Sequence, residues 1–168
     1  MYIFRYKTQE KYSDLLMVSD GEYLTGLIFE GSKDMDKICS CCEERSLPVF
    51  EDTKKWLDIY FSGRDPGFVP RMKFTGISGF RSEVMEIVMK IPFGTSLSYG
   101  DIGRIIAERR GIIKMSARAV GGAVGSNPIC LIVPCHRVLG ATGKLTGYGG
   151  GLENKKALLM HEGIAFHE

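Results

Sequence analysis

A cysteine, a histidine and an arginine stand together at residues 135–137, directly after Pro134. A thiol with an ordinary pKa near ~8.5 is only a few per cent thiolate at neutral pH, so a nucleophilic cysteine needs a base or a nearby positive charge. His136 and Arg137 offer one group of each kind. Adjacent side chains in an extended segment point to opposite faces, so coupling between Cys135 and His136 is expected to run through a water. The pattern predicts a reactive cysteine.

An apolar run at residues 129–133 precedes this cluster and predicts a buried strand. Pro134 should end the strand, because proline has no backbone donor for a ladder. Cys135 would then lie where a rigid strand opens into a loop, a common position for a reactive side chain. Downstream, a glycine-rich turn at 147–151 leads into a helix predicted from Leu152 to about Glu162.

Two short helices upstream of the cysteine form a helix-turn-helix candidate. Ser98 is predicted to cap the first, residues 99–108, with Asp101 completing a capping box. Ser116 is predicted to cap the second, residues 117–124.

The second of these helices has few large side chains. Its small residues are Ala117, Ala119, Gly121, Gly122 and Ala123. Each of two adjacent glycines in a helix interior lowers helix stability by roughly 1 kcal/mol relative to alanine, so their presence here needs an explanation. Close packing against a neighbouring element would explain them. Close approach to a ligand would explain them as well, for example in a DNA minor groove only about 6 Å wide, with Arg118 projecting from the first turn.

The first third of the chain is predicted to be β-rich. Strands are expected at residues 1–6, 15–19 and 23–29, with a hairpin turn at Asp20-Gly21 between the last two. A helix should begin at Pro48 and stop at Ser62-Gly63.

Residues 63–79 have the composition of a linker, so we place a domain boundary near Thr75. This gives an N-terminal domain of residues 1–75 and a mostly helical C-terminal domain of residues 76–168. Ser78 is predicted to cap the first helix of the second domain, which carries apolar residues from Phe80 to Ile91.

The charge is unevenly distributed along the chain. Residues 1–75 carry 11 Lys+Arg against 13 Asp+Glu, a balance of −2, whereas residues 76–168 carry 11 against 7, a balance of +4. Between Ser98 and Lys144 seven basic residues face only two acidic ones, a local +5 around the cysteine. An excess of this kind favours a polyanionic partner, although basic surface stretches are usually just solvated.

Five cysteines without a disulfide-framework spacing, no signal-peptide pattern at the start and no long apolar run predict a cytoplasmic protein, or a nuclear one in a eukaryote, without membrane association. The closely spaced Cys39, Cys41 and Cys42 lack a regular zinc spacing and a nearby histidine, so we expect structural or incidental thiols and no metal. Cys130 is expected in the core.

Several motifs together resemble the methylated-DNA–protein-cysteine methyltransferases, the 6-O-alkylguanine-DNA alkyltransferases. They are PCHRV at 134–138, RAVGGAVGSNP at 118–128, SYGDI at 98–102 and GYGGGLENKKALLMHEG at 147–163. The resemblance runs from about Pro48 to Gly163 in matching order and spacing, and the combination is highly specific. Gly149 departs from the serine that many members have, and Met85 replaces a common tryptophan, which we interpret as a core substitution.

The resemblance implies an α+β protein. A small β-rich N-terminal α/β domain, ribonuclease H-like, would precede a mostly helical domain with a winged-helix-like helix-turn-helix. It also implies direct-reversal DNA repair by a monomer without cofactors, acting on double-stranded DNA that contains 6-O-alkylguanine. The alkyl group would pass irreversibly from the 6-oxygen to Cys135 after base flipping, once per protein molecule.

The resemblance also implies a role for individual residues. His136 would act as base through a water, Glu162 would orient His136, Asn127 would brace the turn at Cys135, and Tyr99 would protonate the departing guanine. DNA contacts would come from Ser98, Ala117, Arg118, Ala119, Gly121 and Arg137. The pocket for the base would be lined by Val138, Tyr148, Gly149 and Gly150, with carbonyls of Cys135 and Val138 accepting from the exocyclic amine.

Two other functions are compatible with parts of the sequence. A helix-turn-helix DNA-binding module or regulator would leave Cys135 inert, and a cysteine hydrolase would need a distant histidine such as His161. The glycine-rich surroundings show no oxyanion-hole pattern, and His161 and His167 are expected at the surface or a helix end.

Overall fold

The computed structural model describes residues 1–38, 41–77 and 79–168, which form two compact units. Unit 1 consists of Met1–Thr75 together with the short segment Pro128–Ile132. Unit 2 consists of Gly76–Asn127 and Val133–Glu168. The chain therefore leaves unit 2 for five residues directly before the cysteine cluster and then returns to it.

Unit 1 is built on a mixed four-stranded sheet. Its strands are β1 (Tyr2–Tyr6), β2 (Leu15–Ser19), β3 (Leu24–Phe29) and the two-residue β4 (Glu43–Glu44), in the order β3-β2-β1-β4. Neighbours are antiparallel except β1 and β4, which are parallel. Between β2 and β3, the carboxylate of Asp20 accepts hydrogen bonds from the amides of Glu22 and Tyr23, at 3.0 and 2.8 Å. The three predicted strands and their hairpin are confirmed.

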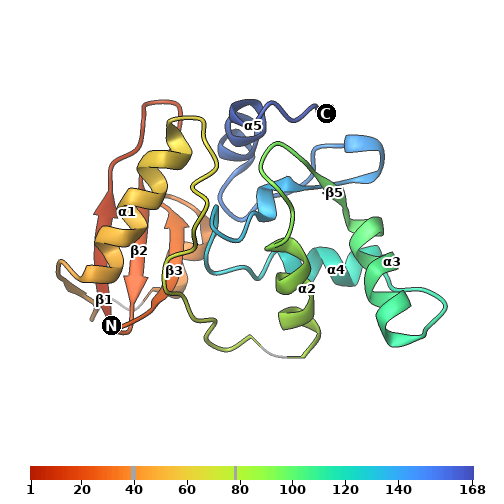
Figure 1. Ribbon diagram of the computed structural model, residues 1–168, viewed down its shortest axis with the longest axis horizontal. Coiled ribbons are helices and arrows are strands. Elements are labelled where there is room, and N and C mark those ends of the chain that lie inside the picture. Colours follow the sequence, from red (N-terminus) through yellow and green to blue (C-terminus); the bar gives the residue numbers. More distant parts are fainter. Residues whose placement is uncertain (39–40, 78) are drawn as a thin grey trace. The chain divides into compact units, whose positions relative to one another are not determined.

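One helix, α1 (Pro48–Phe61), covers a face of this sheet (Figure 1). The rings of Phe4 on β1 and Phe50 on α1 lie 6.0 Å apart, and the hydroxyl of Tyr6 donates to Asp58 at 2.7 Å. The predicted start at Pro48 and the stop at Ser62-Gly63 are confirmed, with Gly63 in the left-handed region at φ 84°. A 3₁₀ turn, η1 (Lys33–Lys37), is the remaining helical element of this unit among the described residues.

Unit 2 is mostly helical. Its helices are α2 (Phe80–Val88), α3 (Tyr99–Arg110), α4 (Ala117–Val124) and α5 (Leu152–His161), and the two-residue strands β5 (Leu97–Ser98) and β6 (Val138–Leu139) pair in parallel. Two 3₁₀ turns, η2 (Cys135–Arg137) and η3 (Ala141–Gly143), flank β6. Helix α4 packs against α2 and α3 through the buried side chains of Val120, Ala123 and Val124.

The helix caps follow the sequence closely. The hydroxyl of Ser98 accepts from the amide of Asp101 at 3.0 Å, and the carboxylate of Asp101 accepts from the amide of Ser98 at the same distance, so the predicted capping box is confirmed. The predicted cap of α4 is confirmed too, since the Ser116 hydroxyl accepts from the amide of Ala119 at 3.4 Å. The cap predicted at Ser78 lies outside the described residues.

The strand predicted at residues 129–133 is wrong. The amide of Leu27 on β3 donates to Pro128, and the amide of Cys130 donates to Leu27, both at 2.9 Å, but this ladder stops after Ile129. Leu131 lies in the left-handed region at φ 67°, and the amide of Ile132 turns back to the carbonyl of Cys130 at 2.8 Å. The apolar run is buried, as expected, but it folds as a tight turn.

Metal-ligand clusters and membrane-spanning helices are both absent from the part of the chain that the structure describes. There, no three His, Cys, Asp or Glu side chains lie together as ligands. No helix in the same residues is long and apolar enough to cross a membrane. Cys130 is a buried free thiol, as predicted, and Cys42 is a half-buried one, whereas Cys39 lies outside the described residues.

Candidate active site

Cys135 begins η2 and is held from two sides. Its amide donates to the carbonyl of Val133 at 2.8 Å, and its side chain is 7% exposed. The side-chain amide of Asn127 donates to the sulfur at 3.0 Å and to the same Val133 carbonyl at 2.9 Å. One amide nitrogen therefore holds both the turn before the cysteine and the sulfur, and only a contact with the turn was expected of Asn127.

A buried network stands next to the thiol. The Nε2 atom of His136 lies 2.6 Å from Oε1 of Glu162. Arg137 donates to both oxygens of that carboxylate, at 2.8 and 3.1 Å, and the amide of Gly94 donates to Oε2 at 3.1 Å. An ionised carboxylate can only accept, so Nε2 of His136 carries the proton and Nδ1 is the basic nitrogen of the ring.

The ionisation states in this network follow from burial and charge. Burial lowers the pKa of His136, with the charges of Arg137 and Lys155 adding to the effect, so the imidazole is neutral at pH 7 despite its carboxylate partner. Burial alone would raise the pKa of Glu162, but the hydrogen bonds from His136 and Arg137 and the positive charge of Arg137 outweigh it and bring the pKa to about 2. A neutral imidazole therefore donates a hydrogen bond to an ionised carboxylate, which Arg137 and the amide of Gly94 also hold in place.

Lys155 is a fully buried cation close to the thiol, and it was not predicted from the sequence. Its ammonium donates to the carbonyl of Val138 at 2.8 Å and to that of Thr146 at 3.4 Å. Burial lowers the pKa of Lys155 to about 8, so most molecules keep the charge at pH 7. The helical spacing of residues 155, 158, 159 and 162 offered a signal, because it puts Lys155 on the face of buried Leu158, Leu159 and Glu162.

The thiol itself is subject to opposing influences. Burial raises the pKa of Cys135, whereas the hydrogen bond from Asn127 and the positive charge of Lys155 lower it. The net direction is upward, so the resting side chain is a thiol and not a thiolate. Nucleophilic chemistry at this sulfur requires removal of its proton as part of the reaction.

Tyr99, the first residue of α3, lies on the same side of unit 2. Its hydroxyl is 3.0 Å from the hydroxyl of Thr146. Burial raises the pKa of Tyr99, so the phenol keeps its proton at neutral pH. Its ring also contacts α4, because a Cβ added at Gly121 would lie 3.7 Å from it.

Of the residues predicted to line the pocket, Val138 and Tyr148 contact the buried Lys155, and Gly149 and Gly150 follow Tyr148 in a turn. The carbonyls of Val138 and Cys135 are already engaged, the first by Lys155 and the second by the amide of Val138, although each carbonyl has two lone pairs. Residues 148–151 form a turn in which the amide of Gly151 donates to Tyr148 at 3.1 Å. Asn154 on α5 anchors the turn by donating to the carbonyl of Gly150 at 2.8 Å.

The exposed face of α4 carries Arg118 and glycine. A Cβ added at Gly122 would meet nothing within 4 Å, so packing inside the protein does not account for that glycine. Of the two interpretations that the sequence left open, close approach to a ligand fits Gly122 better. Ala117, Arg118 and Ala119 are all exposed at the start of the helix.

Two residues expected to contact DNA have other partners here. Arg137 is 7% exposed, and its guanidinium is bonded to Glu162 and to the carbonyl of Ile91 at 2.6 Å. A buried, paired guanidinium is not available to a phosphate, because releasing it would leave Glu162 unpaired. The hydroxyl and amide of Ser98 are engaged in the capping box with Asp101.

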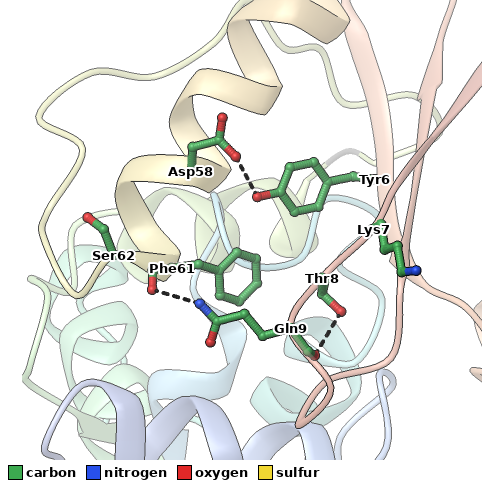
Figure 2. A pocket seen from close by; sticks show the side chains of 7 residues that line it. All are labelled: Tyr6, Lys7, Thr8, Gln9, Asp58, Phe61 and Ser62. Atoms are coloured by element: carbon green, nitrogen blue, oxygen red, sulfur yellow. Dashed lines mark hydrogen bonds between the residues drawn. The ribbon is translucent and has the colours of Figure 1, made fainter.

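A hollow of about 280 Å³ lies in unit 1, between β1 and the end of α1 (Figure 2). Its polar groups are largely satisfied by one another, since Tyr6 donates to Asp58 and the Gln9 side chain reaches the carbonyl of Phe61 at 3.5 Å. None of its lining residues is a cysteine or a histidine, whereas Cys135 and His136 both lie in unit 2.

Comparisons with known proteins fit this arrangement. Residues 79–164 match the family model described as the DNA-binding domain of 6-O-methylguanine DNA methyltransferase. A methylated-DNA–protein-cysteine methyltransferase of Haemophilus influenzae is 38% identical over 90% of this chain and 82% of its own length. The chain belongs to the methylated-DNA–protein-cysteine methyltransferase family.

Further relatives of this family cover nearly the whole chain. The inducible methyltransferase of Bacillus subtilis is 36% identical over 94% of this chain and 93% of its own. The crystal structure of Mycobacterium tuberculosis OGT in complex with DNA has a TM-score of 0.80 and 34% identity, covering 96% of this chain and 92% of that one. The protein is therefore an O6-methylguanine-DNA methyltransferase that acts in DNA repair, as its sequence predicted. The alternative of a DNA-binding regulator without alkyl transfer is not supported.

Proposed function

We propose that Cys135 is the acceptor of the alkyl group and that residues 76–168 carry both the reaction and the DNA contacts. The observation that carries this proposal is the position of the sulfur. The sulfur accepts a hydrogen bond from Asn127, and Cys135 lies in the turn that begins at Val133. The positive charge of the buried Lys155 acts to lower the pKa of the thiol. Displacement at carbon needs a sulfur held in line with the breaking carbon–oxygen bond, and a fixed sulfur meets that need.

His136 takes the thiol proton through a water, on its basic Nδ1 atom. The carboxylate of Glu162 holds the Nε2–H and stabilises the imidazolium that forms, as in other nucleophile–base–carboxylate chains. Arg137 and the amide of Gly94 hold Glu162, so they act as positioning groups.

Tyr99 protonates the guanine as it leaves. In the balanced step, the bond between sulfur and the alkyl carbon forms while the bond between that carbon and O6 breaks. The thiol proton goes to His136, and the electron pair on the departing base is met by a proton from the Tyr99 hydroxyl. A phenol that keeps its proton at neutral pH suits this role, and burial raises the pKa of Tyr99 accordingly.

The substrate is alkylated DNA. A family relative is known in complex with DNA, and the winged-helix-like arrangement of α3, α4, β5 and β6 supports the same for this chain. The target base has to be flipped out of the duplex, at a cost of a few kcal/mol, and Arg118 at the start of α4 would fill the vacated place. Ala117, Ala119 and Gly121 allow α4 to lie in the minor groove, and Val138 with Tyr148, Gly149 and Gly150 lines the pocket for the flipped base.

The product is a thioether, which is a very poor leaving group, so each molecule reacts once and no cofactor is needed. The ribonuclease H-like assignment of unit 1, the monomeric state and the cytoplasmic location stay predictions.

The experiment that tests this proposal follows a labelled methyl group from the DNA to the protein. The protein is incubated with duplex carrying 6-O-methylguanine labelled in the methyl group, and the modified peptide is analysed by mass spectrometry. We expect one methyl per protein, on Cys135. Cys135→Ser should lose transfer and keep its DNA affinity, whereas Cys42→Ser, which removes a free thiol elsewhere, should transfer normally. Methylation of any other residue, or transfer by Cys135→Ser, would overturn the assignment.

A further inference from the structure

We propose that the turn between α3 and α4, residues 111–115, is a second contact with the DNA duplex, in which Ile112 and Ile113 press against the sugars of the minor groove beside α4. This inference rests on the proposed entry of α4 into that groove. It adds an apolar contact, on a segment that the proposed reaction does not use.

The turn presents an apolar tip to solvent. Ile113 is fully exposed at 105%, and Ile112 is 42% exposed. From Glu108 to Ala119, every residue except Met115 is exposed, and the turn extends outward at the end of α3 (Figure 1). Single exposed apolar residues are common, but two adjacent isoleucines at the tip of a projecting turn form a surface that suits a partner.

The base of the turn is fixed. Gly111 ends α3 in the left-handed region at φ 62°, and the amide of Ile112 donates back to Ala107 at 3.0 Å. At the other end, the carbonyl of Met115 lies so close to Gly103 on α3 that an added Cβ would be 3.1 Å from it. The isoleucines are therefore presented by a structured turn.

Charge identifies the kind of partner. Arg109, Lys114 and Arg118 flank the tip, and none of their side chains has a hydrogen bond or ion pair to the described residues. By contrast, Arg104 is paired with Asp101 and Arg110 with Glu83. Glu108 is the single acidic residue between Arg104 and Arg118. Free cations around an apolar tip fit a polyanion with apolar groove walls, and duplex DNA has phosphates and sugars in that arrangement.

The reach of the turn fits the proposed footprint. Ile113 and Arg118 are five positions apart, so their Cα atoms are at most about 18 Å from each other. At roughly 3.4 Å per base pair, the tip contacts DNA within about five base pairs of the position filled by Arg118. Apolar side chains pressed into the minor groove are an established way to hold bent DNA.

The test compares an apolar change with a charge change. In Ile112→Ser/Ile113→Ser we expect the Kd for duplex to rise about 10-fold, with an unchanged slope of log K against log salt, because no phosphate contact is lost. Lys114→Ala should instead reduce that slope by about one. Met160→Ser, which removes an exposed apolar residue from α5, should change neither quantity. Fluorescence anisotropy over a range of salt concentrations measures both.

Reaction with free 6-O-methylguanine base separates this inference from the proposed function. We expect the double variant to react with the free base at the wild-type rate, which also shows that its site is folded. Ile113→Ser alone, at a position without packing contacts to lose, should give part of the effect. An unchanged duplex Kd would overturn the inference, and so would a change in the oligomeric state of the free protein, which would make the tip a self-association surface. Failure of the wild type to methylate Cys135 would instead refute the proposed function.

Discussion

At the scale of single residues, the site combines a thiol that resists ionisation with a cation that favours it. Burial raises the pKa of Cys135 and lowers that of Lys155, whereas the opposite charges of thiolate and ammonium act against both shifts. The resting sulfur is a thiol, and Lys155 stabilises the negative charge that develops when the proton leaves.

Lys155→Met tests this pairing. We expect the pKa of Cys135 to rise by about one unit, because the variant keeps the length of the side chain and removes the nearby charge. The pH dependence of alkylation by iodoacetamide reports the thiol pKa directly. In the wild type, the support from Lys155 should fade as the pH rises above about 8, where this lysine loses its proton.

Lys156→Met is the matched control. Lys156 is the next residue of α5, and it forms ion pairs with the exposed acids Glu153 and Glu168, away from the thiol. We expect its alkylation profile to follow that of the wild type. Equal shifts in the two variants would show that the effect does not come from the buried charge.

Most residues of this candidate site carry specific motifs in the sequence. The structure brings Cys135 next to Asn127 and His136 next to Glu162, and their roles stay predictions. The burial of Arg137 was not predicted, because an arginine beside a basic run gives no sign of a buried carboxylate 25 positions later.

At the scale of elements, the small residues of α4 lower the stability of the free protein. Gly122 is exposed, and a Cβ there would meet no neighbour. In Gly122→Ala we expect the free protein to gain about 1 kcal/mol of stability, or roughly 2–4 °C in Tm, because alanine favours the helix. Binding to duplex DNA should weaken, since the added methyl group would face the groove.

Thermal unfolding and anisotropy with duplex DNA measure these two effects separately. The reaction with free 6-O-methylguanine base serves as the control, and it should be unchanged. Stabilisation together with full DNA affinity would show that this face of α4 does not lie close to the groove.

The helix caps and the hairpin could be predicted because neighbouring residues in the sequence specify them. The segment 129–133 was predicted wrongly because no neighbouring residue indicates its turn. The capping residues Ser98 and Ser116 and the hairpin residue Asp20 act within three positions, so the sequence contains the reason for each. The run 129–133 has the composition of a strand, but the positive φ of Leu131 interrupts it after a single bridge to β3. Tertiary packing imposes that conformation, and no property of the run itself indicates it.

At the scale of the whole molecule, Glu162 links the site to acid stability. Its pKa is lowered from an ordinary 4.5 to about 2, so its contribution is fully present above about pH 5 and is lost as the pH falls towards 2. A shift of this size corresponds to about 3 kcal/mol of unfolding free energy. Urea unfolding at pH 7, 4 and 3 should show this loss.

Two variants isolate the contribution of Glu162. Glu162→Gln should be less stable at pH 7, because Arg137 then lacks its buried partner, and it should lose less stability on acidification. Glu153→Gln removes a carboxylate that is 91% exposed and should follow the wild-type pH profile. Parallel pH profiles for wild type and Glu162→Gln would contradict the role of Glu162.

The path of the chain between the units also determines what limited proteolysis should produce. Residues 128–132 hydrogen-bond to β3 inside unit 1, yet they are an interior stretch of the polypeptide that otherwise builds unit 2. A protease that nicks the connection around residues 63–77 would leave two fragments, each holding a piece of the same folded body. We expect such a cut to yield an associated pair, and we expect a chimaera that joins the two halves of different relatives to lose stability unless residues 128–132 come from the same parent as β3.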